Sequence, residues 1–121
     1  MAKMEAKTFI PQYKDCYIPK TSDQDIIVDV AIGDGQEGSY SVFLGKNLVK
    51  SNAEANIGKK ADVAGKKTTV SVTIVDELKE TNWTSMTVFF SEGGERTQFG
   101  PYKMQAENHL DTVIYTLKLI H

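Results

Sequence analysis

The sequence predicts an all-β protein: a single-domain antiparallel β-sandwich of seven to eight strands with at most one short helix. Two stretches carry this prediction, residues 68–75 (TTVSVTIV) and 83–90 (WTSMTVFF), because polar and apolar side chains alternate along both. Side chains of a strand alternate between its two faces, so each stretch would bury one face and expose the other. Turn signals also recur about every 8–12 residues, which is typical of sandwiches and barrels. We expect an immunoglobulin-like or jelly-roll-like sandwich, with a small β-barrel as the alternative.

Length and composition set the class of protein. The 121 residues fit one domain covering 1–121, and the 40% of hydrophobic residues are enough for one core. Cys16 is the one cysteine, so no internal disulfide can form and a reducing compartment is expected. The first seven residues (MAKMEAK) lack the apolar segment of a signal peptide, and no run approaches the roughly 18 apolar residues of a membrane helix. These features predict a cytoplasmic protein, with a removed leader as the alternative.

The first half of the chain contains one hairpin. Residues 1–24 are expected to be an irregular or edge segment. Residues 25–32 and 39–44 alternate as two strands, and the glycine-rich turn 33–38 between them favours a hairpin. Phe43 is expected on the outer face. The predicted inner residues are Ile26, Val28, Val30, Ile32, Tyr40, Val42 and Leu44.

Residues 45–67 break the alternation. Ser51 to Glu54 has the form of a helix-capping box, which predicts a helix of one to two turns ending at Gly58. The following lysine-rich stretch, 58–67, is expected to be a loop.

The second half of the chain supplies four predicted strands: 68–75, 83–90, 96–102 and 109–120. They are separated by an acidic loop at 76–82, a glycine turn at 91–95 and a polar loop at 103–108. Trp83 is a candidate core residue, and Phe89 is expected to face outward beside an inward Phe90. The predicted inner residues are Val70, Val72, Ile74, Met86, Val88, Phe90, Val113, Tyr115, Leu117 and Leu119.

Metal and catalytic motifs are scarce. Cys16, His109 and His121 are too far apart in sequence for a zinc motif. His109 and Asp111 would share a face of a strand, with Asp111 on its outer side, but no Gly-x-Ser-x-Gly nucleophile turn or nucleotide-binding glycine loop occurs. We therefore expect neither an enzyme nor a cofactor. The weak calcium candidates, which lack EF-hand spacing, are Asp34, Glu37, Asp76, Glu77 and Glu80.

Charge and aromatic residues give the remaining candidates. Six lysines lie between 46 and 67 against only Glu54 and Asp62, and such a patch can steer an acidic partner. Phe89, as an outward aromatic, is a second candidate contact. The net charge of −2 gives no basic excess, so neither nucleic acid nor a membrane is expected as a partner. The predicted patch residues are Lys59, Lys60, Lys66 and Lys67.

These observations favour a non-catalytic binding or assembly module that contacts another protein or a second copy of itself. The alternative is a carbohydrate-binding or small-ligand-binding domain that uses the loops at the end of the sandwich, with calcium assisting. An aromatic stacking platform for that alternative would draw on Tyr40, Trp83, Phe99 and Tyr102.

Overall fold

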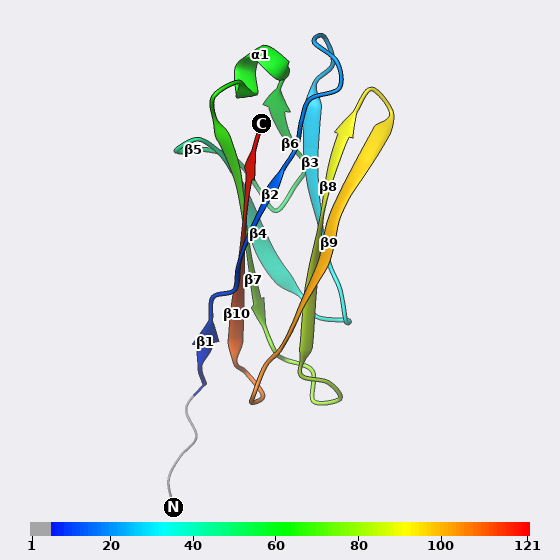
Figure 1. Ribbon diagram of the computed structural model, residues 1–121. Coiled ribbons are helices and arrows are strands. Elements are labelled where there is room, and N and C mark those ends of the chain that lie inside the picture. The colour runs from blue at the N-terminus through cyan, green and yellow to red at the C-terminus, as the bar shows by residue number, and fades with distance from the viewer. Residues whose placement is uncertain (1–5) are drawn as a thin grey trace, which may run out of the picture.

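The computed structural model describes residues 6–121 and contains two packed β-sheets with one short helix (Figure 1). The strands of the six-stranded sheet are β1 (Thr8–Phe9), β2 (Gln12–Cys16), β4 (Gly38–Leu44), β5 (Asn47–Ser51), β7 (Lys67–Val75) and β10 (Thr112–Ile120). Those of the four-stranded sheet are β3 (Ile26–Ile32), β6 (Ala55–Gly58), β8 (Trp83–Glu92) and β9 (Glu95–Gln105). The sheets keep separate edges, so the predicted sandwich is confirmed and the barrel alternative is wrong.

The order of strands places the N-terminal segment at a sheet edge. The six-stranded sheet runs β1-β10-β7-β4-β5, and β2 also pairs with β10; the other sheet runs β6-β3-β8-β9. Both β1 and β2 lie parallel to β10, whereas all the other pairs are antiparallel. The strands β1 and β2, which belong to the segment 1–24 predicted to be irregular or at an edge, therefore both lie along β10. An immunoglobulin-like or jelly-roll-like connectivity stays a prediction.

The core lies between the sheets and follows the predicted alternation. Phe90 is fully buried, while Phe89 lies on the outer face of β8. Val28, Val72 and Leu117 are also fully buried. Burying a side chain of this size contributes about 1.5–3 kcal/mol, so these rows of residues account for most of the driving force. Within residues 6–121, no helix is long and apolar enough to cross a membrane.

The strands run along the long axis of the molecule and leave two distinct ends (Figure 1). We call one the helical end; it carries α1 (Lys60–Val63) with residues 17–25, 59–66 and His121. We call the other the loop end; it carries the connections 33–37, 76–82 and 106–111. Because strands separate these ends, surfaces on them are available to different neighbours.

The predicted helix after Ser51 is wrong. Asn52 has a left-handed φ of 56°, which turns the chain, and Ala55–Gly58 then form β6 against β3. Ala55 and Ile57 both point into the core, an alternation that a strand satisfies. The helix lies instead in the stretch predicted as a loop, where Asp62 Oδ2 accepts the backbone N–H of Lys59 at 2.8 Å. With β6 and the short edge strands, residues 6–121 form ten strands rather than the predicted seven or eight.

Two further predictions need correction. Trp83 is 44% exposed at the start of β8 and is not a core tryptophan. The last strand begins at Thr112 rather than His109, because Leu110 has a left-handed φ of 69° that interrupts the extended chain.

Candidate functional site

An apolar hollow lies at the helical end. It has a volume of about 190 Å³, with walls from the segment after β2 and from the α1 region. Ile18 is 69% exposed, although it is a large hydrophobic residue, whereas Val63 is fully buried beneath the surface. Pockets for small organic ligands usually measure about 300–1,000 Å³, so this hollow is the size for a single side chain rather than a drug-sized molecule. Its lining residues are Ile18, Pro19, Lys60, Val63, Ala64, Gly65 and His121.

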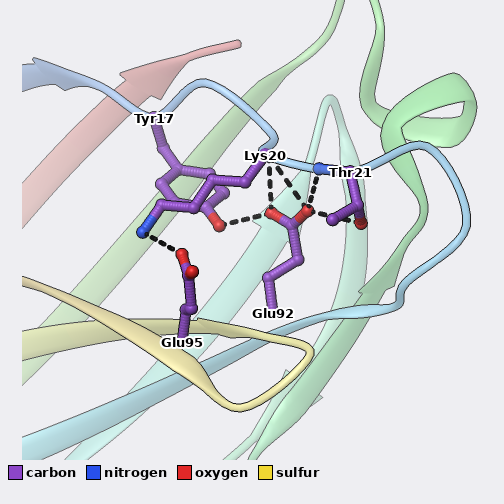
Figure 2. Close-up of polar contacts among 5 residues, drawn as sticks. All are labelled: Tyr17, Lys20, Thr21, Glu92 and Glu95. Atoms are coloured by element: carbon purple, nitrogen blue, oxygen red, sulfur yellow. Dashed lines mark hydrogen bonds and ion pairs between the residues drawn. The ribbon is translucent and has the colours of Figure 1, made fainter.

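A buried carboxylate positions one wall of this hollow. Glu92, at the end of β8, is 3% exposed and accepts hydrogen bonds from the segment that carries Ile18 (Figure 2). Its Oε1 accepts the hydroxyl of Tyr17 at 2.5 Å, and its Oε2 accepts Thr21 N at 2.7 Å and Thr21 Oγ1 at 2.9 Å. Lys20 N lies 3.1 and 3.0 Å from the two oxygens. We call these contacts the Glu92 network; they fix both sides of Ile18–Pro19.

The Glu92 network also sets the protonation of its members. Burial acts to raise the pKa of Glu92, but the hydrogen bonds from Tyr17, Lys20 and Thr21 outweigh it and lower that pKa below its ordinary value. Burial, followed by the contact with Glu92, raises the pKa of Tyr17 well above its ordinary value. Glu92 is therefore ionised and Tyr17 neutral at pH 7, the combination in which the hydroxyl donates to a carboxylate.

The opposite wall is tied to the last residue of the chain. His121 Nδ1 lies 2.9 Å from the carbonyl oxygen of Tyr17, and its Nε2 lies 2.6 Å from Thr68 Oγ1. A carbonyl can only accept, so Nδ1 carries the proton, and in the neutral ring Nε2 accepts from the hydroxyl of Thr68. This bridge joins the segment after β2 to the start of β7, next to α1.

One residue of the predicted lysine patch, Lys60, lines this hollow. Lys59, Lys60, Lys66 and Lys67 are all exposed, and Lys60 is part of the hollow's lining. Within residues 6–121, none of the four forms an ion pair with a carboxylate. The structure therefore combines an exposed apolar contact with positive charges that have no internal partner.

Phe89, the other predicted contact, lies elsewhere. It is on the outer face of the four-stranded sheet, opposite Asp29 and Gln98 in the neighbouring strands. The guanidinium carbon of Arg96 lies 3.6 Å from the ring centroid, a cation–π contact that covers the aromatic face. Phe89 faces outward as expected, but it is not part of the helical end.

The loop end is acidic and contains a buried polar pair. Gln36 Nε2 donates to Asp76 Oδ1 at 2.8 Å, and both side chains are buried. In the part of the chain that the structure describes, the other Asp76 oxygen has no hydrogen-bond partner. Beside this pair, Leu110 is 50% exposed, and its backbone N–H donates to the carbonyl of Asp76 at 2.7 Å.

The structure does not gather the calcium candidates into a metal site. Among residues 6–121, no group of three His, Cys, Asp or Glu side chains is placed to hold a metal ion. Asp76 is buried against Gln36, Asp34 lies 3.9 Å from Lys103 Nζ, and Glu77 is exposed. A cation at the loop end would have too few carboxylate ligands from this set.

The pair of His109 and Asp111 is also not brought together as a catalytic unit. Asp111 is fully buried, which corrects its predicted place on an outer face. Its Oδ1 accepts Lys7 N and its Oδ2 accepts Asn108 N, at 2.7 and 2.8 Å. Its pKa is lowered chiefly by the Lys7 backbone hydrogen bond, against the effect of burial. His109 is exposed. The Asp111 carboxylate therefore fixes the backbone of Lys7 and Asn108 and does not orient the His109 imidazole.

The aromatic candidates do not form a flat exposed platform. Phe99 is buried, and Tyr102 stacks on Tyr13 with ring centroids 4.3 Å apart. Tyr40 is half-buried, and its hydroxyl lies 3.4 Å from Asp29 Oδ1. Trp83 alone of the four is largely exposed, and Cys16 is exposed on the edge strand β2.

Three residues that shape the two ends were not predicted from the sequence: Ile18, Glu92 and Leu110. An isoleucine followed by proline in a polar connection was the one available signal for Ile18, since apolar residues in loops are often placed for contact. In the sequence, Glu92 is indistinguishable from an exposed glutamate in a turn. Nothing in the order of residues indicates that its hydrogen-bond donors come from residues 17–21.

Comparisons with models of protein families, with curated proteins and with solved structures found no match. A function must therefore be inferred from the geometry of the molecule itself.

Proposed function

We propose that this chain is a non-catalytic binding or assembly module whose helical end docks an acidic segment of protein. The observation that carries this proposal is the hollow between Ile18 and Val63, which is lined by the exposed Lys60 and has three further exposed lysines close by in the chain. Such a surface matches a partner that presents one apolar side chain flanked by carboxylates. The apolar residue would fill the hollow, and the carboxylates would meet the lysines.

The expected energies support a modest, salt-sensitive contact. Full burial of an isoleucine side chain contributes about 1.5–3 kcal/mol, and most of the Ile18 surface is still available for burial. Each exposed ion pair with a lysine adds only about 0.2–1 kcal/mol and is screened by salt. The lysines therefore contribute mainly orientation and association rate, while the apolar contact supplies most of the affinity.

A binding role also fits the chemistry of the buried carboxylates. The Glu92 carboxylate accepts every donor of the network around it, and its lowered pKa leaves it poorly suited to take up a proton at neutral pH. Asp111 likewise accepts backbone donors. Both carboxylates hold loops in place, which is a structural role.

The alternative function, binding of a carbohydrate or other small polar ligand, has one observation in its favour. A shallow hollow of about 310 Å³ at the loop end is lined by Glu37, Gly38, Ser39, Thr73, Val75 and Glu77. Hydroxyls and carboxylates suit a polyol. A titration with neutral oligosaccharides that shifts the amide signals of Ser39 and Thr73, and leaves those of Ile18 and Val63 unchanged, would favour this alternative.

The docking proposal is tested by peptide titration. A capped peptide of sequence EELEE, with EESEE as matched control, is added to ¹⁵N-labelled protein at low salt. The expected result is that EELEE shifts the amide signals of Ile18, Val63 and Ala64, that EESEE does so much less, and that Lys60→Glu with Lys66→Glu weakens binding about tenfold. Lys79→Glu, at the loop end, is the matched control and leaves binding unchanged. Equal shifts with both peptides, or none at these residues, would contradict the proposal.

A further inference from the structure

We infer that the acidic partner is a second copy of this chain, whose loop end docks onto the helical end of its neighbour. This inference rests on the proposed docking role of the helical end. It names the occupant of the hollow as Leu110 of the next copy, and it makes the protein a head-to-tail assembly module.

The charge distribution supports a self-complementary pair of ends. The loop-end connections, together with the adjoining residues 6–7, carry seven acidic residues against Lys7 and Lys79, although the whole chain has a net charge of only −2. The rest of the chain therefore has a net positive charge, and at the helical end Lys20, Lys59, Lys60 and Lys66 outnumber Asp23, Asp25 and Asp62. The acidic residues are Asp34, Glu37, Asp76, Glu77, Glu80, Glu107 and Asp111.

Leu110 is the apolar contact that the hollow requires. It is 50% exposed at the loop end, between Glu107, which is paired with Lys7 Nζ at 3.0 Å, and the buried Asp111. Its φ of 69° is in the left-handed region, which costs an ordinary L-residue about 1–2 kcal/mol. The backbone N–H of Leu110 is held by the carbonyl of Asp76 at 2.7 Å, so the turn keeps this side chain displayed. A leucine that is both strained and exposed is a feature expected at a contact surface.

The size of the hollow agrees with this occupant. A volume of about 190 Å³ takes one branched aliphatic side chain and is below the range of small-molecule pockets. The wall residues Ile18, Pro19 and Ala64 are apolar, and the exposed Lys60 is also part of the lining. The loop end thus presents an exposed apolar side chain, Leu110, together with the exposed carboxylates of Glu37, Glu77 and Glu80 from its other two connections.

The position of the two surfaces determines the kind of assembly. They lie at opposite ends of the strands (Figure 1), so a contact between them is heterologous: each copy uses one surface for each neighbour. Such contacts form an open chain, or a ring where the rotation between copies closes. The contact does not need the edge strands of either sheet.

The experiment uses two variants, each defective at one end, and sedimentation velocity at low salt. Leu110→Gly removes the loop-end side chain at a φ that glycine accepts, so the fold is kept. The double variant Ile18→Ser, Lys60→Glu alters the helical end. The wild type is expected to grow in mass with concentration and to dissociate as salt is raised. Each variant alone should remain monomeric, with self-association weakened at least about tenfold.

Mixing the two variants gives the decisive measurement. The intact helical end of Leu110→Gly can meet the intact loop end of the double variant, and no further copy can be added. The expected product is therefore a one-to-one dimer that does not grow further. Circular dichroism and urea unfolding of each variant confirm that both are folded; should the double variant unfold, Lys60→Glu, Lys66→Glu replaces it.

The outcomes separate this inference from the docking proposal. A wild type that stays monomeric at low salt, but whose Ile18 and Val63 signals still shift with EELEE, overturns the head-to-tail inference and leaves the docking role. Failure of both experiments overturns both. Self-association that persists in both variants, or a mixture that grows beyond a dimer, places the interface elsewhere and also overturns the inference.

Discussion

The Glu92 network gives the sharpest prediction about stability. Glu92→Gln keeps the shape of the side chain but removes its charge and one of its two acceptor oxygens. Four donors meet the carboxylate: the Tyr17 hydroxyl, Lys20 N, Thr21 N and Thr21 Oγ1. The amide N–H₂ of glutamine would face some of these donors and cannot accept from them.

The expected loss of unfolding free energy follows from the number of hydrogen bonds that the substitution affects. A hydrogen bond to a charged group contributes about 1.5–3 kcal/mol, and a buried donor without a partner costs about 1–3 kcal/mol. With the amide nitrogen in the place of Oε1, the Tyr17 hydroxyl can rotate and accept from it, while the bonds from Lys20 N, Thr21 N and Thr21 Oγ1 lose their charged acceptor. We therefore expect Glu92→Gln to lower the free energy of unfolding by about 2–4 kcal/mol at pH 7. For a domain of this size, that is a large part of a total of about 5–15 kcal/mol.

Glu95→Gln is a matched control on the same turn (Figure 2). It removes the same charge, but the Glu95 side chain is 68% exposed, and its ion pair with Lys20 Nζ, at 3.0 Å, lies at the surface. An exposed ion pair of this kind contributes no more than about 1 kcal/mol. Urea unfolding followed by circular dichroism compares the two variants with the wild type.

The pH dependence checks the cause of the effect. The folded-state pKa of Glu92 is lowered from an ordinary value of 4.5, so its contribution is fully present above that value and is lost as the pH falls through the folded-state pKa. The difference between wild type and Glu92→Gln should therefore be constant from pH 7 to about 5 and shrink below pH 4.5. Equal unfolding midpoints for the Glu92→Gln and Glu95→Gln variants at pH 7, or a deficit that is unchanged at pH 3, would refute this reasoning.

Three further predictions test other parts of the molecule. Phe90→Ala should destabilise the protein by about 3–5 kcal/mol, whereas Phe89→Ala, which loses mainly the contact with Arg96, should cost about 1 kcal/mol or less; similar losses for both in urea unfolding would contradict the inward and outward assignment. Leu110→Gly should leave the free energy of unfolding unchanged or raise it by up to about 1 kcal/mol, because glycine relieves the left-handed strain; a loss above that amount in thermal unfolding would mean that the side chain packs internally. Tyr115→Phe should cost about 1–2 kcal/mol by removing the buried hydroxyl that meets Thr84 Oγ1 at 2.8 Å, with near-ultraviolet circular dichroism unchanged; no measurable loss would show that this bond contributes nothing net.

The incorrect prediction of a helix after Ser51 shows where inference from the local sequence pattern fails. Ser51 to Glu54 has the pattern of a capping box, but a cap is useful only where a helix follows. The strand β6 instead pairs with β3, an element about 30 residues earlier, and burial of Ala55 and Ile57 in the core outweighs a weak local preference for helix. Whether residues 55–58 form a helix or a strand depended on β3, which lies outside the local sequence pattern.

The lysine patch was found in the sequence, but the surface it belongs to was not. Lys59, Lys60, Lys66 and Lys67 are close in the chain, so their charge is visible as a local excess. The hollow beside them needs Ile18 and Pro19 from a distant part of the sequence, and these are held in place by Glu92. Tyr17 and Glu92 are separated by 75 positions, and no spacing rule joins them.

The amino-acid sequence by itself determined that the strands of this protein have one buried face and one exposed face. Phe89 and Phe90 point to opposite sides because neighbouring side chains on an extended chain must do so, whatever lies around them. The tertiary structure alone decided which carboxylates are buried, which backbone amides they hold, and that Leu110 takes a left-handed conformation at the end of the molecule opposite the lysines. The physical reason is that alternation is a property of adjacent residues, whereas burial and charge pairing depend on which distant segments the packed sheets bring together.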